Sequence, residues 1–292
     1  MTTPTPTPSG TAWSRAAPAY AALIDATDAL NPAGAACREI LNLVATELPL
    51  DSASFILDMG TGSGPVISAL LDAPAHAARI PTGARIVAAD VAEGLLAILR
   101  ERRREREGEE GVWRRLEVQE WDARDLSREI GDGEVSHLLS SYAYFAFAEE
   151  EKALAEAYRV LAAGGLFVET SMGWTEWGHL PTFFSGVRPD KAIPGPGSHW
   201  QSVEGVRRTL ERVGFKDVGV REYGIGIAVP SAEAAVEMVF GAFPWVEGFV
   251  ADMSAEEVRR AREAMAAWVR ERHRGEEKIL LRGTGLIGWG RK

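Results

Sequence analysis

The sequence predicts an α/β protein built on a doubly wound, seven-stranded mixed sheet. Short apolar runs alternate with helical patterns from about residue 50 to residue 222, as expected for parallel strands joined by crossover helices. A glycine cluster directly follows the first apolar run, and the second run ends in a carboxylate, Asp90. Both features fall where ligands bind in such sheets, at the carboxyl ends of the strands.

Length and composition fit one large globular domain. The chain has 292 residues, of which 46% are hydrophobic and 25% charged, enough for a real core. Its 32 Lys and Arg against 42 Asp and Glu give a net charge of −10, which argues against nucleic acid as the main partner. Cys37 is the only cysteine, so neither an intrachain disulfide nor a cysteine zinc site can form. With no secretory signal pattern and no apolar window long enough to span a membrane, we expect a cytoplasmic protein.

The first 170 residues predict two leading helices and then five strands with their crossover helices. Residues 1–12 are rich in Thr and Pro and predict a disordered tail. Residues 13–49 have helical spacing that breaks at Asn31 and Pro32. The helix before the fifth strand is expected to end at Gly164 and Gly165. The expected strands are 54–58, 84–90, 115–119, 135–141 and 165–170, and the expected helices between them are 65–71, 92–107, 124–130 and 149–162.

The alternation stops after Thr170 and resumes only in part. Residues 171–200 are rich in Gly, Pro, Trp and Phe, and residues 223–275 look helical. A helix near 202–213, a strand near 216–222 and a last strand near 279–289 complete the pattern. The simplest organisation is therefore a single domain over 13–292. Its core is expected at about 50–222 and 279–292, with cap segments at about 13–49, 171–200 and 223–275.

The stretch Leu57–Gly64 places Gly60, Gly62 and Gly64 at alternate positions between a strand and a helix. Glycine accepts positive φ and lets the backbone approach a ligand, while the helix start offers free N–H groups. The dinucleotide fingerprint G-x-G-x-x-G requires a third glycine where Pro65 stands. The observed G-x-G-x-G spacing, with an acid two residues before its first glycine, resembles motif I of class I S-adenosylmethionine (SAM) dependent methyltransferases.

The resemblance to these methyltransferases covers roughly residues 50–222 and rests on several ordered elements. In the family an acid after the second strand holds the ribose hydroxyls, which is the position of Asp90; capping the next helix is an alternative role. Residues 120–123 resemble the adenine clamp, and 156–167 resemble the signature of a helix, R-x-L, two glycines and a strand. His137 departs from the Asp that is usual there. The resemblance implies SAM as cofactor, held by Tyr20, Asp58, Gly60, Thr61, Gly62, Gly64, Asp90, Val91, Trp121, Asp122, Ala123 and Ser140.

The whole chain also looks like fungal small-molecule methyltransferases of the gliotoxin thiomethyltransferase type. The leading helices, the stretch 171–174 and the late helical insertion carry this likeness. It implies transfer of a methyl group to an S-, O- or N-atom of a small, largely apolar or aromatic metabolite, in natural-product tailoring. Such an in-line transfer mainly requires alignment and exclusion of water, although a phenol or alcohol acceptor would gain from a base.

Candidate acceptor-side residues come from the end of the fourth strand and from the aromatic-rich second half. Aromatic walls suit a flat or bulky acceptor, and packing of the cap onto the sheet is the alternative role for each ring. The candidate catalytic residues are His179 and Tyr142. No metal is expected, because His, Asp and Glu show no ligand spacing. The expected substrate contacts are Tyr144, Trp174, Trp177, Trp200 and Phe243.

Three other classes of function are alternatives to methyl transfer to a small molecule. The same fold could bind SAM without methyl transfer, as a pericyclase, another cyclase or a regulatory protein. Pro65 and the lack of a Ser, Tyr and Lys relay disfavour a nicotinamide-dependent oxidoreductase. The net charge and the lack of a basic appendage disfavour an RNA or protein methyltransferase. The expected partner is a small-molecule substrate, without nucleic acid or membrane, and the chain is expected to be a monomer or a homodimer.

Overall fold

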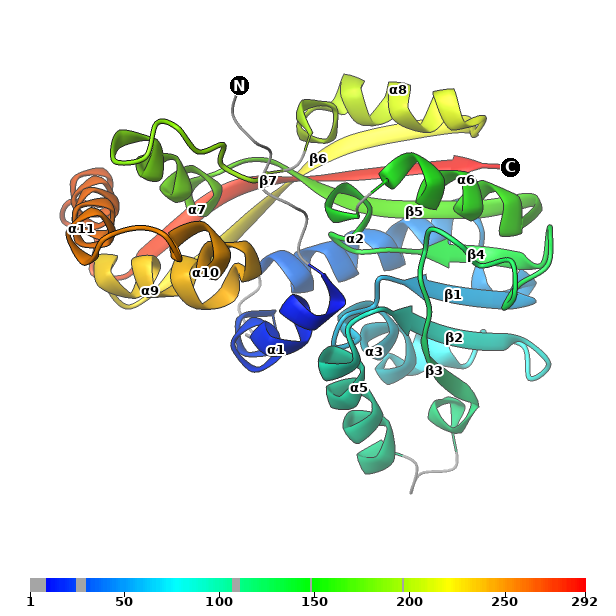
Figure 1. Ribbon diagram of the computed structural model, residues 1–292. Coiled ribbons are helices and arrows are strands. Elements are labelled where there is room, and N and C mark those ends of the chain that lie inside the picture. Colours follow the sequence, from blue (N-terminus) through cyan, green and yellow to red (C-terminus); the bar gives the residue numbers. More distant parts are fainter. Residues whose placement is uncertain (1–8, 25–29, 107–110, 148, 196) are drawn as a thin grey trace.

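One seven-stranded sheet forms the centre of the molecule (Figure 1). The structure is a computed structural model that describes residues 9–24, 30–106, 111–147, 149–195 and 197–292, so most of the expected tail, residues 1–8, lies outside the described residues. The strand order is β3-β2-β1-β4-β5-β7-β6, with β7 antiparallel to both of its neighbours and the other pairs parallel. The predicted α/β class and mixed sheet are confirmed. The strands are β1 (Phe55–Met59), β2 (Arg85–Asp90), β3 (Leu116–Glu120), β4 (Val135–Leu139), β5 (Leu161–Thr175), β6 (Lys216–Val229) and β7 (Ile279–Arg291).

Helices cover both faces of this sheet. One face packs against α2, α3 and α5 through a core that includes Ile40, Ile67 and Leu99. The other face packs against α6 and α8 through Leu154 and Leu210. None of the described helices is long and apolar enough to cross a membrane. The helices are α1 (Gly10–Ile24), α2 (Pro32–Glu47), α3 (Pro65–Asp72), α4 (Pro74–Ala77), α5 (Glu93–Arg106), α6 (Glu150–Val160), α7 (Glu176–His179), α8 (Val203–Val213), α9 (Ala232–Ala242), α10 (Pro244–Val250) and α11 (Ala255–Arg272).

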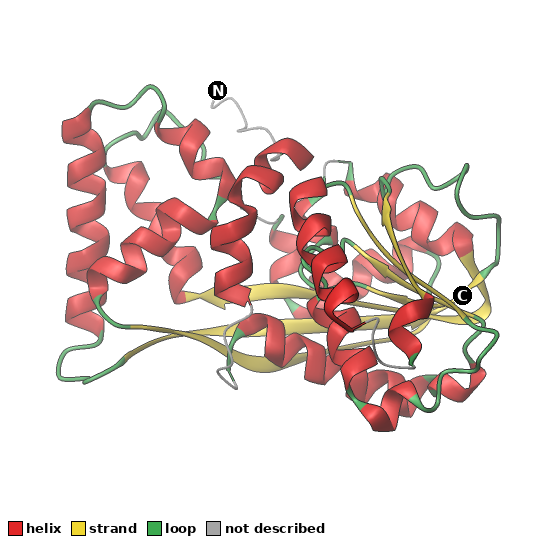
Figure 2. Ribbon diagram, turned by 90° about the horizontal axis from the view of Figure 1, so that it is seen from below, coloured by secondary structure: helices red, strands yellow, loops and turns green. Residues whose placement is uncertain are grey.

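The strands β6 and β7 run beyond the rest of the sheet and carry a helical cap. They stay paired from Lys216, opposite Arg291, to Val229, opposite Ile279. Figure 2 shows these strands reaching under the cap helices at one end of the molecule. The cap, with α7, α9, α10 and α11, has its own core, and α1 contacts both the cap helices α9 and α10 and the sheet-side helix α5.

The helix expected at 124–130 does not form. Asp122 accepts a hydrogen bond from the backbone N–H of Arg124, and Asp125 accepts one from the backbone N–H of Ser127. Such short-range contacts between an aspartate and the backbone two residues on stabilise turns in place of helix. The segment between β3 and β4 is therefore a series of turns.

Three boundaries also differ from those expected. The helix α6 ends at Val160, and β5 begins at Leu161, which pairs with Val135, so the two glycines at 164 and 165 lie inside the strand. The strand β6 continues through residues 223–229, expected as helix, because β7 supplies hydrogen-bonding partners along that length. The helix α1 begins at Gly10, so the last residues of the expected tail form its first turn.

Candidate functional site

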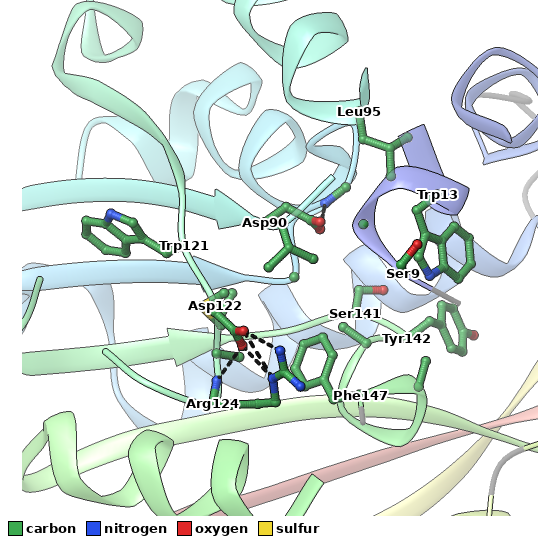
Figure 3. A pocket seen from close by; sticks show the side chains of 18 of the residues that line it. Ser9, Trp13, Asp90, Leu95, Trp121, Asp122, Arg124, Ser141, Tyr142 and Phe147 are labelled. Carbon is green, nitrogen blue, oxygen red and sulfur yellow. Dashed lines mark hydrogen bonds and ion pairs between the residues drawn. The ribbon is translucent and has the colours of Figure 1, made fainter. Parts of the chain in front are cut away.

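A cavity of about 560 Å³ opens at the carboxyl ends of the first four strands. This volume is within the usual range for small-molecule sites. Figure 3 shows side chains from the ends of β2, β3 and β4 and from α1 around this cavity. It is lined by Ser9, Gly10, Thr11, Trp13, Tyr20, Met59, Gly60, Gly62, Asp90, Val91, Leu95, Trp121, Asp122, Ala123, Arg124, Ser141, Tyr142, Ala143, Ala146 and Phe147.

The glycine loop forms the floor of the cavity. Gly60 and Gly62 line it with φ angles of +70° and +58°, in the left-handed region that side-chain-bearing residues rarely adopt. A Cβ at Gly60 would collide with the Cβ of Ala143, which lies directly beside it. Gly64, predicted with them, does not line the cavity, and a Cβ there would collide with Leu99. Two of the three glycines therefore face a ligand, and the third permits close packing of α5.

Asp90, at the end of β2, joins the glycine loop to the next helix. One carboxylate oxygen accepts from the backbone N–H of Gly62 at 2.9 Å, and the other accepts from Ala92 at 2.9 Å. Burial nevertheless raises the pKa of Asp90 above its ordinary value. Each carboxylate oxygen has a further lone pair, so the group still suits two adjacent hydroxyls, as in a ribose. Asp90 thus orders the turn before α5 and leaves acceptor sites toward the cavity.

The segment after β3 brings an ion pair to the cavity wall. Nη2 of Arg124 lies 2.6 Å from Oδ2 of Asp122, and the backbone N–H of Arg124 donates to Oδ1 at 2.9 Å. The guanidinium holds the pKa of Asp122 below its ordinary value. Trp121 and Ala123, also predicted, line the same wall. Figure 3 shows the indole of Trp121 turned away from the cavity, and the Arg85 guanidinium carbon lies 5.8 Å from the centre of that ring. A base with an exocyclic amine would therefore meet here the carboxylate of Asp122, whose orientation is fixed by Arg124.

Asp58 and Thr61 lie behind the loop and do not line the cavity. The hydroxyl of Thr61 donates to Oδ2 of Asp58 at 2.6 Å, while Oδ1 is buried without a hydrogen-bond partner among the described residues. Burial raises the pKa of Asp58 to about 7. Ser140, also predicted, is buried and donates to the carbonyl of Met59, so its neighbour Ser141 faces the cavity instead.

The helix α1 covers the cavity with two aromatic rings. Tyr20, a predicted residue, and Trp13 both line the cavity, and their ring centroids are 5.1 Å apart in an edge-on arrangement. Phe147 faces them from the loop after β4. Trp13 and Phe147 were absent from the expected binding residues. The sequence signal for these two residues is weak, because each is a single aromatic residue in a segment without a motif.

Of the expected catalytic residues, the structure brings only Tyr142 to this cavity. Tyr142 comes directly after Ser141 in the chain and lines the cavity with it, and the Tyr142 hydroxyl lies 2.8 Å from that of Tyr223. His179 lies on the cap, in a separate groove between α11 and the short helix Leu180–Gly186, next to Phe183 and Trp268.

None of the expected substrate contacts lines the cofactor-sized cavity. Tyr144, Trp177 and Trp200 are buried in the cores, because large aromatic side chains gain most from complete burial. The indole N–H of Trp200 is satisfied by Glu150 at 2.6 Å. Trp174 is 53% exposed beside Arg272, and Phe243 packs in the cap core. No group of His, Cys, Asp and Glu within the described ranges could hold a metal ion.

Comparisons with known proteins agree with this geometry. Residues 56–165 match a family model described as a methyltransferase domain. The chain is 28% identical over 197 residues to methyltransferase ucsB of an Acremonium species, covering 66% of this chain and 67% of that protein. It is 38% identical over 125 residues to the demethylmenaquinone methyltransferase of Thermus thermophilus, covering 42% of this chain and 50% of the relative. Among solved structures, the [4+2]-cyclase SpnF superposes with a TM-score of 0.56 at 18% identity, over 99% of each chain, which shows a common fold.

The family match places a methyltransferase domain at residues 56–165, a range that includes the glycine loop and the strands β2, β3 and β4. The chain is therefore an enzyme of methyl transfer, and SAM is its cofactor. The cavity fits that cofactor chemically, because a half-buried carboxylate, a side-chain-free floor and several aromatic faces suit an adenosine that carries a positively charged sulfonium.

Proposed function

We propose that this enzyme transfers the methyl group of SAM to an S-, O- or N-atom of a small, largely apolar or aromatic metabolite. The observation that carries the proposal is the aromatic wall of the cavity, to which Trp13, Tyr20, Tyr142 and Phe147 contribute. Aromatic walls bind flat or apolar molecules and exclude water. The likeness to methyltransferase ucsB of an Acremonium species supports methyl transfer, and we extend the proposal to natural-product tailoring.

We further propose which residues hold the cofactor. Asp90 would accept the ribose hydroxyls, Asp122 would accept from the adenine amine, and the backbone at Gly60 and Gly62 would approach the methionine portion. When bound, SAM supplies an activated methyl group whose leaving group is neutral. The chain itself aligns the acceptor and excludes water, and proximity of this kind is worth several kcal/mol of barrier.

The proposal is tested by release of S-adenosylhomocysteine (SAH) from SAM in the presence of thiol, phenol and amine acceptors. Turnover of at least one small acceptor is expected. Asp90→Asn should raise the Kd for SAM about tenfold or more, because it removes charge-assisted hydrogen bonds. Asp217→Asn, on exposed β6, is the matched control and should leave that Kd unchanged.

A SAM-binding protein without methyl transfer, such as a cyclase, is the alternative that this experiment separates. The fold shared with SpnF over the whole chain motivates it. Tight SAM binding with no SAH formed from any acceptor in the panel would favour that alternative. Turnover without any effect of Asp90→Asn would instead contradict the proposed ribose site.

A further inference from the structure

Tyr142 has an unusual backbone for a cavity residue. Its φ is +54°, in the left-handed region that is costly for a bulky side chain. The surrounding structure maintains this conformation, since the Tyr142 N–H donates to both the carbonyl and the hydroxyl oxygen of Thr170, each at 3.1 Å. Strained residues that are held in this way concentrate at functional sites. Figure 3 shows the ring beside Trp13, across the cavity from Trp121.

The hydroxyl of Tyr142 is held in place by a second phenol, Tyr223 of β6. The two hydroxyl oxygens are 2.8 Å apart, and either hydroxyl can be the donor. The strand β7 places Gly285 opposite Tyr223, and any Cβ there would collide with the Tyr223 ring. When Tyr223 donates to Tyr142, the hydroxyl proton of Tyr142 is left for a ligand.

This pair of phenols can donate a hydrogen bond but is a poor base. Burial raises the pKa of both Tyr142 and Tyr223 well above the ordinary tyrosine value, so both remain protonated at neutral pH. The described residues that line the cavity include no His, Lys or Cys. Its two carboxylates, Asp90 and Asp122, already bind backbone N–H groups or Arg124. An acceptor that binds here must therefore bring its own reactive lone pair.

We propose that Tyr142, positioned by Tyr223, donates a hydrogen bond to the acceptor oxygen, and that the acceptors are acidic phenols or enols that arrive as anions. This inference rests on the proposed function and narrows its acceptor class. An oxygen lone pair forms a bond to the methyl carbon while the bond from that carbon to the sulfonium sulfur breaks, with both electrons moving to sulfur. The anion and the cation become a neutral ether and a neutral thioether, so no proton needs to be removed by the protein.

The test is a titration of the SAH-bound protein with 4-nitrophenol, whose phenolate absorbs visible light. The wild-type complex should bind the probe as the phenolate and lower the apparent pKa of the bound probe relative to solution, because Tyr142 stabilises the anion. With SAM in place of SAH, the methyl ether should form, and the pH profile of kcat/KM should follow ionisation of the probe. A complex that does not bind the phenolate would overturn the proposal, even if thiols or amines are methylated.

Two variants examine the assigned roles separately. Tyr142→Phe should weaken phenolate binding about tenfold or more and abolish the pKa shift of the probe, since it removes a hydrogen bond to a charged group. Tyr223→Phe, outside the cavity lining, should reduce the same shift in part. Tyr158→Phe, which removes the hydroxyl of a tyrosine packed on Phe215 away from the cavity, is the matched control and should change neither quantity.

Titration of each variant with SAH reports whether the cofactor cavity is intact. Phenolate binding and a probe pKa that are unchanged in both Tyr142→Phe and Tyr223→Phe would refute the assignment. A proportional loss for phenolate and for thiophenol in Tyr142→Phe would also refute it, because a thiol is a weak hydrogen-bond acceptor. If the protein does not transfer methyl groups at all, no acceptor will give SAH from SAM. This outcome is distinct from a failure of the Tyr142 assignment, which is measured by phenolate binding.

Discussion

Replacing Glu169 by Gln should stabilise the protein, and the gain should grow with pH. Glu169 lies in β5 and is fully buried. Neither carboxyl oxygen has a hydrogen-bond partner within the part of the chain that the structure describes. The side chain lies over Gly288, near Val206 and Leu210, so its surroundings are apolar. Burial raises the pKa of Glu169 well above its ordinary value, and the carboxyl is therefore protonated in the folded protein.

The sign and size follow from proton linkage. Below the unfolded pKa of about 4.3, Glu169 is protonated in both states and its ionisation costs no stability. Because the folded pKa is raised, the free energy of unfolding of the wild type falls as the pH rises from there toward the folded pKa. The loss approaches about 1.4 kcal/mol per pH unit, so the step from about pH 5 to about pH 6.5 is worth about 2 kcal/mol. For a chain of 292 residues this corresponds to about 3 °C in Tm.

The assay is thermal unfolding of the wild type and Glu169→Gln at several pH values, with urea unfolding as an independent measure. The difference in Tm should widen steadily across the acidic range. Glu222→Gln, an exposed position on β6, is the control and should show no such trend. Parallel Tm curves for wild type and Glu169→Gln would refute the reasoning, because they would mean that the buried carboxyl does not resist ionisation.

Three other changes have measurable consequences. Because the pKa of Asp58 is about 7, binding of the cationic SAM should release a proton near neutral pH, and SAM affinity should rise with pH. Calorimetry in buffers of different ionisation enthalpy measures the number of protons released, which should be smaller for Asp58→Asn. Gly62→Val should abolish measurable SAM binding, since a branched side chain is strained at positive φ and lies at the cavity floor; equal Kd values would exclude that role. In urea unfolding, Glu176→Ala should lower the free energy of unfolding by about 3 kcal/mol, because Glu176 is buried and binds Arg272. The control Glu263→Ala, on the exposed face of α11, should lower it by less than about 1 kcal/mol.

The sheet and the glycine loop could be predicted because their signals are local. Gly60 and Gly62 need positive φ whatever surrounds them, and the strand ending in Asp90 is visible as an apolar run. The turns at 124–130 could not be predicted from residue spacing, because that spacing is helical and the short contacts of aspartates with the backbone form turns instead.

The acceptor side was harder to predict because its residues meet only through tertiary structure. Trp200 and Trp177 have the composition of a pocket wall, yet both are buried in cores, as the hydrophobic effect favours for large rings. Tyr142 and Tyr223 are 81 residues apart in sequence, and only the pairing of β6 with β7, and of β7 with β5, brings their hydroxyls together. No spacing rule connects such a pair.

The long hairpin of β6 and β7 gives the cap an unusual attachment. Val229 and Ile279 face each other as partners, so the segment 230–278 leaves and re-enters the fold at adjacent points. A short hairpin turn could join these two ends without removing any residue that lines the cavity, but α1, which covers the cavity, would lose its contacts with α9 and α10. The length and sequence of the segment 230–278 can therefore diverge between enzymes with little change to the strands, provided that the surface that holds α1 is kept.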